Sequence, residues 1–422
     1  MPTLQEFWKP VFNRFDPWWK LDSEIELARF YVERENSPLE KLITTLQFSR
    51  EPQKALLVGH IGSGKTSSLA RLRERLKDQF FVVELNAETG LNTYNVGHAE
   101  VLVNLGLGVY FQARERKIQI DQAKFDGLVE SLRTLIIEQG EEGAAFFSTE
   151  KVLEKIGLMI KYGFKRELSS SLEVGPTVPE IVHRVNDLIA DAEKKIGNQI
   201  LVTIDGLDRL DVDLARKVFA HSTLLTRPAC HVVYTIPITL RYDSNFDDAR
   251  ANFRVCDLPN FKVNARNGDP YPSGRELLAQ VIHKRLADYV PADNPIFTTA
   301  AMELLVAMSG GLLRDLMHLC QSACGEAVRA GAYTVDESHA RTAVLALTGE
   351  YAANLRQAHW EELQQVHQSK LLTTRVEKLS IGGEVKEVVL CDQLLEGRHI
   401  FAYANHDTWF DVHPVLTANL AR

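Results

Sequence analysis

Residues 54–68 read KALLVGHIGSGKTSS, and this stretch decides the fold. Its apolar run at 55–58 predicts a buried strand, and leucines after Thr66 recur at helical spacing. Between strand and helix lies Gly59-x-x-x-x-Gly64-Lys65-Thr66, here called the phosphate loop (residues 59–66). Glycines allow backbone N–H groups to close round a phosphate, and the following helix points its positive end at the anion. The stretch therefore predicts a nucleotide site.

Each position of the phosphate loop has an expected task. We expect Lys65 to reach the β- and γ-phosphates of ATP and the Thr66 hydroxyl to bind Mg²⁺. Further cofactor contacts are expected from Gly59, Gly62, Ser63, Gly64 and Ser67. The alternative is a glycine turn before an ordinary helix, but the motif and both of its flanks agree on nucleotide binding.

Composition limits the class of protein. A chain of 422 residues with 45% hydrophobic content predicts a globular protein of roughly two or three domains. A net charge of -8 does not indicate DNA binding, although one basic face is compatible with it. Five cysteines without metal-ligand spacing favour a reducing, cytoplasmic location. No signal peptide opens the chain, and the most apolar stretch, residues 101–109, is too short to span a membrane.

A second buried strand is predicted at residues 80–84, and the clearest strand, at residues 200–204, ends in Asp205-Gly206-Leu207-Asp208. An acid at the carboxyl end of a buried parallel strand is placed to bind Mg²⁺ beside a phosphate loop. We therefore expect Asp205 to be a metal ligand. Asp208 could orient or deprotonate the attacking water, or it could cap the helix that follows.

Two further side chains are candidates for contact with the γ-phosphate. Thr235 lies at the end of a strand predicted at 231–237 and could touch the phosphate or the water, or it could be an ordinary strand-end threonine. Arg254 follows on a polar stretch and could reach a neighbouring subunit's nucleotide, which would imply a homo-oligomer. The alternative is that Arg254 is only solvated.

Patterns in the second half of the chain predict a group of helices and then a region of mixed helix and strand. A glycine turn at 309–311 leads into a helix with Arg314, which could bind the γ-phosphate from a helical lid or could pair with Asp315. Residues 385–395 suggest one helix, and 399–404 and 408–412 suggest a hairpin. Helices followed by a two-stranded wing indicate a winged helix. Basic residues there do not outnumber acids, so protein contact is expected rather than DNA contact.

These motifs, in this order, make residues 30 to 420 similar to AAA+ ATPases of the Orc/Cdc6-like and STAND group. The resemblance implies that Thr235 acts as sensor 1 and Arg314 as sensor 2. It also places Val32 and Arg34 near the adenine, although a plain surface turn is the alternative there. In AAA+ motors that hydrolyse ATP rapidly, the position of Gly206 is typically a glutamate. The glycine here therefore implies slow hydrolysis.

The expected fold is α/β, a P-loop NTPase core with a parallel sheet and helical insertion, then a helical lid and a C-terminal winged helix. The predicted domains are 1–50 (strap and first helix), 51–265 (core, with the insertion at about 91–198), 266–345 (lid) and 346–422 (winged helix). The expected function is an ATP-binding switch that slowly hydrolyses ATP to ADP and phosphate. It would control an effector or regulator protein through the winged helix or the insertion, as in bacterial conflict systems. The alternative is an oligomeric DNA-loading or DNA-remodelling ATPase of Orc/Cdc6 or transposition-regulator type.

Overall fold

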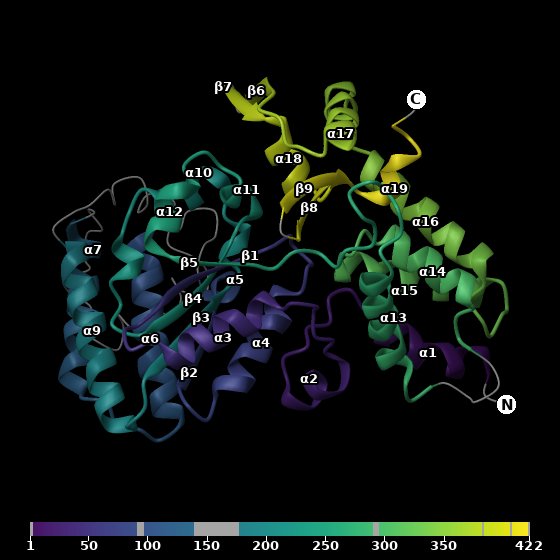
Figure 1. Cartoon of the computed structure of the whole chain (residues 1–422). Coiled ribbons are helices and arrows are strands. Elements are labelled where there is room, and N and C mark those ends of the chain that lie inside the picture. The colour runs from purple at the N-terminus through teal and green to yellow at the C-terminus, as the bar shows by residue number, and fades with distance from the viewer. Residues whose placement is uncertain are drawn as a thin grey trace. The chain divides into compact units, whose positions relative to one another are not determined.

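The computed structural model describes residues 3–90, 97–138, 177–289, 295–381, 384–405 and 407–420. The chain folds into two compact units, whose elements are labelled in Figure 1. The loop–lid unit comprises Met1–Ser37, Gly59–Ala70 and Asp257–Arg422, and the sheet unit comprises Pro38–Val58 and Arg71–Cys256. The phosphate loop therefore packs with the lid and the winged helix in one unit.

The sheet unit is built on a five-stranded sheet in the order β2-β3-β4-β1-β5 (Figure 1). Its strands are β1 (Lys54–Val58), β2 (Phe81–Asn86), β3 (Ile200–Asp205), β4 (His231–Ile236) and β5 (Arg254–Asp257). The pairs β1–β4, β2–β3 and β3–β4 are parallel, so the carboxyl ends of these strands share one edge. Their side chains are almost all buried, as expected for parallel strands covered on both faces. The predicted parallel core is confirmed.

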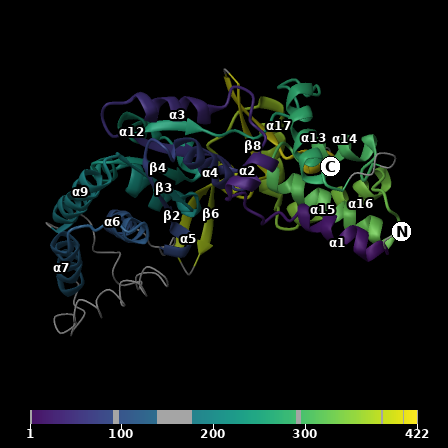
Figure 2. The same cartoon turned by 90° about the horizontal axis from the view of Figure 1, so that it is seen from below.

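Helices fill the interval between β2 and β3. They are α5 (Ala87–Gly90), α6 (His98–Glu115), α7 (Gln122–Glu138) and α9 (Thr177–Ile196). Both α6 and α7 pack against α9, as Figure 2 shows. A Cβ at Gly106 would lie 2.9 Å from Leu128 and 3.0 Å from Val185, so glycine permits this close packing. The predicted helical insertion is confirmed for its described part, and residues 91–96 and 139–176 of it lie outside the described residues.

Further helices complete the sheet unit. They are α3 (Pro38–Phe48), α10 (Val212–Ala215), α11 (Ile238–Arg241) and α12 (Phe246–Asn252). Helix α4 (Lys65–Leu76) continues from the phosphate loop, and its residues up to Ala70 belong to the loop–lid unit. Tight turns of helix occur at Leu207–Arg209, Arg216–Ala220 and Leu224–Thr226.

The lid is helical, as predicted. It comprises α13 (Pro272–Leu286), α14 (Thr299–Met308), α15 (Leu313–Arg329) and α16 (Glu337–Ala352), preceded in the chain by α1 (Leu4–Arg14) and α2 (Glu24–Phe30). The apolar stripe of α15 is buried. Helix α1 packs on α15, and the buried Trp8 indole donates a hydrogen bond to the carbonyl of Ala332 at 2.8 Å.

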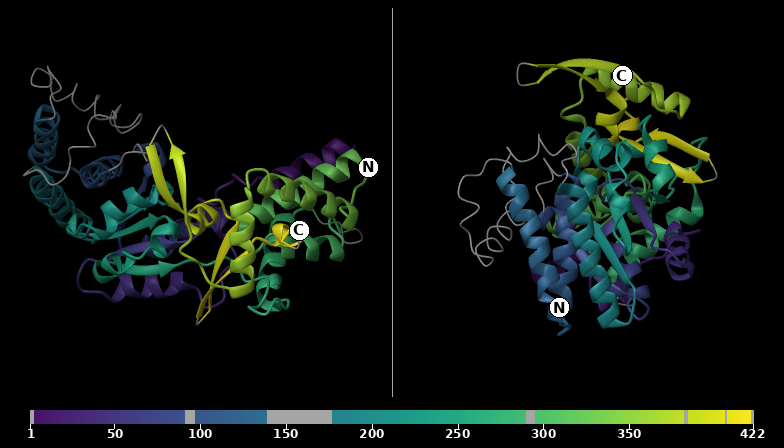
Figure 3. Two further views of the ribbon diagram at one scale, coloured as in Figure 1. Left: turned by 90° about the horizontal axis from the view of Figure 1, so that it is seen from above. Right: turned by 90° about the vertical axis from the view of Figure 1, so that its left-hand side faces the viewer.

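The winged helix comprises α17 (Gln357–Ser369), β6 (Val376–Ile381), β7 (Glu384–Val389), α18 (Leu390–Glu396), β8 (Ile400–Asn405), β9 (Asp407–Val412) and α19 (Pro414–Thr417). The hairpin predicted near 399–412 is β8–β9. The single helix predicted at 385–395 is wrong in its first half, because β7 pairs antiparallel with β6 and a helix begins only at Leu390. Figure 3 shows β6 and β7 as a two-stranded arm. Among the described helices, none has the length and apolarity to cross a lipid bilayer.

Candidate nucleotide-binding site

The phosphate loop adopts a backbone that its glycines make accessible. Gly62 and Gly64 have φ values of +93° and +98°, in the left-handed region that L side chains rarely adopt. A Cβ at Gly62 would lie 2.7 Å from the Cβ of Arg314, and one at Gly64 would lie 2.9 Å from a methyl of Leu313. Glycine is thus required both by the turn and by the close approach of α15.

Lys65 is the cation of the phosphate loop. Its side chain is buried, and its Nζ donates hydrogen bonds to the carbonyls of Gly59 at 2.7 Å and His60 at 2.9 Å. Helix α4 begins at Lys65, so Thr66 and Ser67 lie in its first turn, where backbone N–H groups favour an anion. The predicted phosphate ligands are therefore contiguous on one loop and one helix end.

Arg34 contacts the backbone of the phosphate loop. Its buried guanidinium donates to the carbonyls of Ser63 and Pro259, and it stacks 4.2 Å from the ring centre of Phe261. Burial lowers the pKa of Arg34 to about 10, which leaves it charged near neutral pH. Val32 lies two residues earlier and is half-buried. That Arg34 and Val32 lie near adenine stays a prediction.

The glycine turn before α15 has no room for side chains. Gly310 and Gly311 have φ values of +59° and +84°. A Cβ at Gly311 would lie 1.6 Å from the carbonyl oxygen of Phe261, and one at Gly310 would lie 2.3 Å from the ring of Phe401 in β8. The turn therefore packs tightly against the winged helix.

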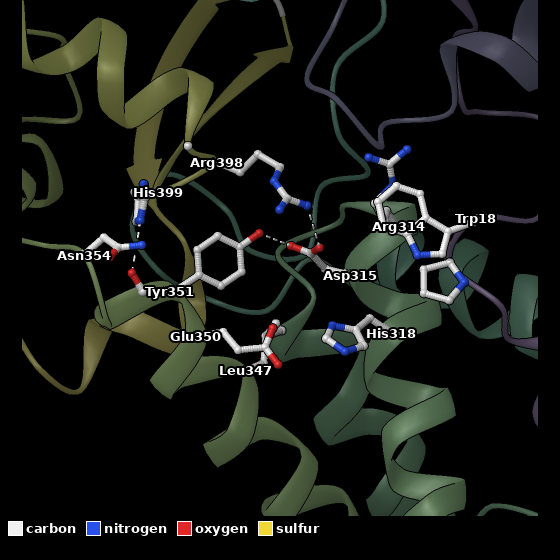
Figure 4. Close-up of a pocket in the computed structure, with 12 residues that line it drawn as sticks. Trp18, Arg314, Asp315, His318, Leu347, Glu350, Tyr351, Asn354, Arg398 and His399 are labelled. Carbon is white, nitrogen blue, oxygen red and sulfur yellow. Dashed lines mark hydrogen bonds and ion pairs between the residues drawn. The ribbon is translucent and has the colours of Figure 1, made fainter. Parts of the chain in front are cut away.

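Arg314 joins the lid to the phosphate loop through its backbone. Its N–H donates to the carbonyl of Gly62 at 3.1 Å. Its guanidinium carbon lies 4.8 Å from the ring centre of Trp18, an arrangement visible in Figure 4. Whether the side chain reads a γ-phosphate stays a prediction.

Asp315, the residue after Arg314, contacts side chains of α16 and of the winged helix. It lies between Tyr351 and Arg398 in a cavity of about 350 Å³ (Figure 4). Tyr351 donates to it at 2.6 Å, Arg398 donates at 3.1 Å, and His413 Nε2 lies 3.0 Å away. Burial alone would raise the pKa of Asp315, but the hydrogen bond and charge of His413 and the charge of Arg398 hold it below its usual value. Asp315 thus ties α15 to α16 and to the winged helix.

His60 connects the phosphate loop to the winged helix. The His60 side chain is buried, its Nε2 accepts a hydrogen bond from the Ala402 N–H at 3.1 Å, and its ring packs 5.3 Å from that of Phe401. Burial and the charge of Lys65 lower the pKa of His60 to about 3, so the ring is neutral and can accept. Sequence analysis did not identify His60, because it fills a variable position of the motif.

At the carboxyl edge of the sheet, Asp205 ends β3 and accepts from the Gly206 N–H at 2.9 Å. Thr235 is buried, donates to the carbonyl of Ile204 at 3.4 Å and accepts from the Leu207 N–H at 3.2 Å. Thr235 therefore ties β4 to the turn after β3. Its contact with phosphate or water stays a prediction.

The remaining two candidates lie elsewhere in the sheet unit. Asp208 lies half-buried in the short turn Leu207–Arg209, and the N-cap of α10 is Asp211, so the helix-cap alternative for Asp208 is wrong. Arg254 is exposed, and its Nε donates to the side chain of Gln53 at 3.3 Å. Its role as a finger stays a prediction.

Comparison with known proteins supports the fold of the region that carries the phosphate loop. The model of the KAP family P-loop domain matches residues 36–233, which include the phosphate loop and β1 to β3. Together with the parallel sheet, this match confirms the predicted P-loop NTPase fold. No curated protein sequence matches the chain.

Several solved structures are similar at low identity. Cdc6p from Pyrobaculum aerophilum is 12% identical, with 97% of this chain and 96% of that chain covered and a TM-score of 0.42. The Aeropyrum pernix ORC1 protein, in complex with DNA, is 13% identical, with 97% and 96% covered and a TM-score of 0.43. The RuvB Holliday junction branch migration motor of Thermotoga maritima is 12% identical, with 84% and 79% covered and a TM-score of 0.38.

Proposed function

We propose that this protein is an ATP-dependent switch that binds ATP with Mg²⁺, hydrolyses it slowly and thereby controls a partner protein or assembly. The observation that carries the proposal is a pair of hydrogen bonds made by the phosphate loop, one through the backbone of Gly62 and one through the side chain of His60. One joins Gly62 to the lid at Arg314, and the other joins His60 to the winged helix at Ala402. Rearrangement of this loop by nucleotide would act on both.

Lys65 gives a physical reason why nucleotide would rearrange the loop. Its Nζ donates hydrogen bonds to the carbonyls of Gly59 and His60, and a β- or γ-phosphate would accept hydrogen bonds from the same N–H groups. If the Lys65 ammonium binds phosphate instead, both carbonyls lose their hydrogen bonds. One of these carbonyls belongs to His60, whose side chain contacts Ala402 in β8. A ligand shifts a conformational equilibrium only through such differential contacts.

The expected chemistry assigns oxygen ligands to the metal. Thr66 and Asp205 carry the hydroxyl and carboxylate oxygens that Mg²⁺ prefers, and they would hold the ion that neutralises charge on the phosphates. Asp208 and Thr235 are proposed to position the attacking water, and Arg254 to act towards a neighbouring copy. Gly206, which carries no acid beside Asp205, supports slow turnover.

Hydrogen exchange tests the switch directly. We expect Mg²⁺-ATP to lower the protection of the Ala402 amide relative to Mg²⁺-ADP, because its acceptor His60 moves with the phosphate loop. Exchange is measured amide by amide with each nucleotide and without it. The Lys65→Ala protein is the control and should show no nucleotide effect. Equal protection in all states of the wild type would refute the switch, whatever its affinity for ATP.

Arg314→Ala is expected to lower the preference for ATP over ADP by about one to two decades. A charge-assisted contact to the γ-phosphate is worth about 1.5 to 3 kcal/mol, and ADP lacks that group. Both nucleotides are titrated calorimetrically. Arg329→Ala is the matched control, because Arg329 lies in the last turn of the same helix and pairs with Glu326. An ATP-to-ADP ratio that equals the wild-type ratio means that Arg314 is not a γ-phosphate sensor.

A DNA-loading ATPase is the alternative function. Such a protein would bind duplex DNA with an affinity that falls steeply with salt, because phosphate contacts release counterions. The net charge of -8 favours the switch. Tight, salt-dependent DNA binding in the presence of ATP would favour the alternative.

A further inference from the structure

The turn after Asp205 leaves a space that another element fills. Gly206 has a φ of +88° and is buried. A Cβ at this position would lie 3.0 Å from Cγ of Glu88 and 3.1 Å from Oδ1 of Asn86. The space of a side chain next to Asp205 is therefore occupied by two polar residues, Asn86 at the end of β2 and Glu88 in α5.

The pairing of β2 with β3 places Glu88 next to Gly206. Asn86, the last residue of β2, is paired in register with Asp205 of β3, so the two strands end side by side. The chain then turns into α5, where the Glu88 N–H donates to Oδ1 of Asn86 at 2.9 Å. This backbone contact fixes where the Glu88 side chain leaves the sheet edge.

Arg209 holds the carboxylate of Glu88 from the other side. Its Nε lies 2.7 Å from Oε1 of Glu88, and the Glu88 side chain remains 32% exposed. Water can therefore reach the carboxylate. A partly exposed acid fixed beside Asp205, the acid proposed to bind the metal, has the position and chemistry of a general base.

We propose that Glu88 is the carboxylate that accepts a proton from the water attacking ATP, an inference that rests on the proposed hydrolysis. The water oxygen forms a bond to the γ-phosphorus, and the bond from that phosphorus to the β,γ-bridging oxygen breaks. ADP leaves with the electron pair, and the water proton passes to Glu88. Asp205 keeps the metal, and Asp208 orients the water rather than deprotonating it.

Glu88→Gln is expected to slow single-turnover phosphate release by about 100-fold or more, the usual contribution of a general base. The amide keeps the Cγ that packs on Gly206 but cannot accept the proton, so the affinity for Mg²⁺-ATP should stay within about threefold. The thermal unfolding midpoint should also match the wild type. Arg209→Gln is the matched control: it removes the ion pair but keeps the acid, and should retain turnover within about tenfold.

The outcomes separate this inference from the function it rests on. If Glu88→Gln turns over ATP as fast as the wild type, Glu88 is not the base, but the proposed hydrolysis still stands. If Asp208→Asn then loses turnover, Asp208 is the base. Equal loss in Glu88→Gln and Arg209→Gln means that the ion pair only supports the structure. A wild-type protein that binds ATP without releasing phosphate contradicts the proposed hydrolysis, and the role of Glu88 falls with it.

Discussion

Lys65→Ala is expected to abolish ATP binding measurable by calorimetry. The ammonium is the buried cation of the phosphate loop, and charge-assisted contacts to two phosphates are worth about 1.5 to 3 kcal/mol each. Their loss should weaken binding by at least about 100-fold. Removal of the side chain also leaves the carbonyls of Gly59 and His60 without the hydrogen bonds that Nζ now donates.

The control for this variant is Lys54→Ala. Lys54 is also a buried lysine, at the start of β1, and its Nζ donates to the carbonyl of Pro52 at 3.3 Å. It lies outside the phosphate loop, so its loss should affect stability and leave ATP affinity nearly unchanged. If Lys65→Ala binds ATP like the wild type, the phosphate loop is not the nucleotide site.

Asp315→Ala is expected to cost about 3 to 5 kcal/mol of unfolding free energy, the usual cost of removing one partner of a buried charge network. The variant leaves the buried His413 and the half-buried Arg398 without their shared carboxylate. The lid and the winged helix lose a direct connection, so urea unfolding should show the winged helix separating first.

The pH dependence of folding stability gives an independent check on the contacts of Asp315 with His413 and Arg398. Because its folded pKa lies below the ordinary value, Asp315 contributes stability that is present above the unfolded pKa of about 3.9 and is lost as pH falls through the folded pKa. Asp315→Ala should lack this part of the acid dependence. The matched control is Glu326→Ala on the same helix, an exposed pair with Arg329 that should leave stability nearly unchanged. Identical acid unfolding of wild type and Asp315→Ala would contradict the network.

Local patterns in the sequence predicted the elements that carry the site. The phosphate loop, the strand that ends at Asp205 and the β8–β9 hairpin were all predictable, because each is encoded by residues close together in the chain. Apolar runs specify buried parallel strands, and glycines specify backbone that other residues avoid. These signals also identified the P-loop fold.

Tertiary structure alone decided which side chains meet. Strand β7 was missed because its valines fit a helix equally well, and only pairing with β6 selects the strand. His60 meets a backbone group 342 positions away, and Asp315 meets partners 36, 83 and 98 positions away. Glu88 reaches Gly206 only because β2 and β3 are neighbours in the sheet. A sequence pattern sets the preference of a segment, but contacts between distant segments depend on how the whole chain packs.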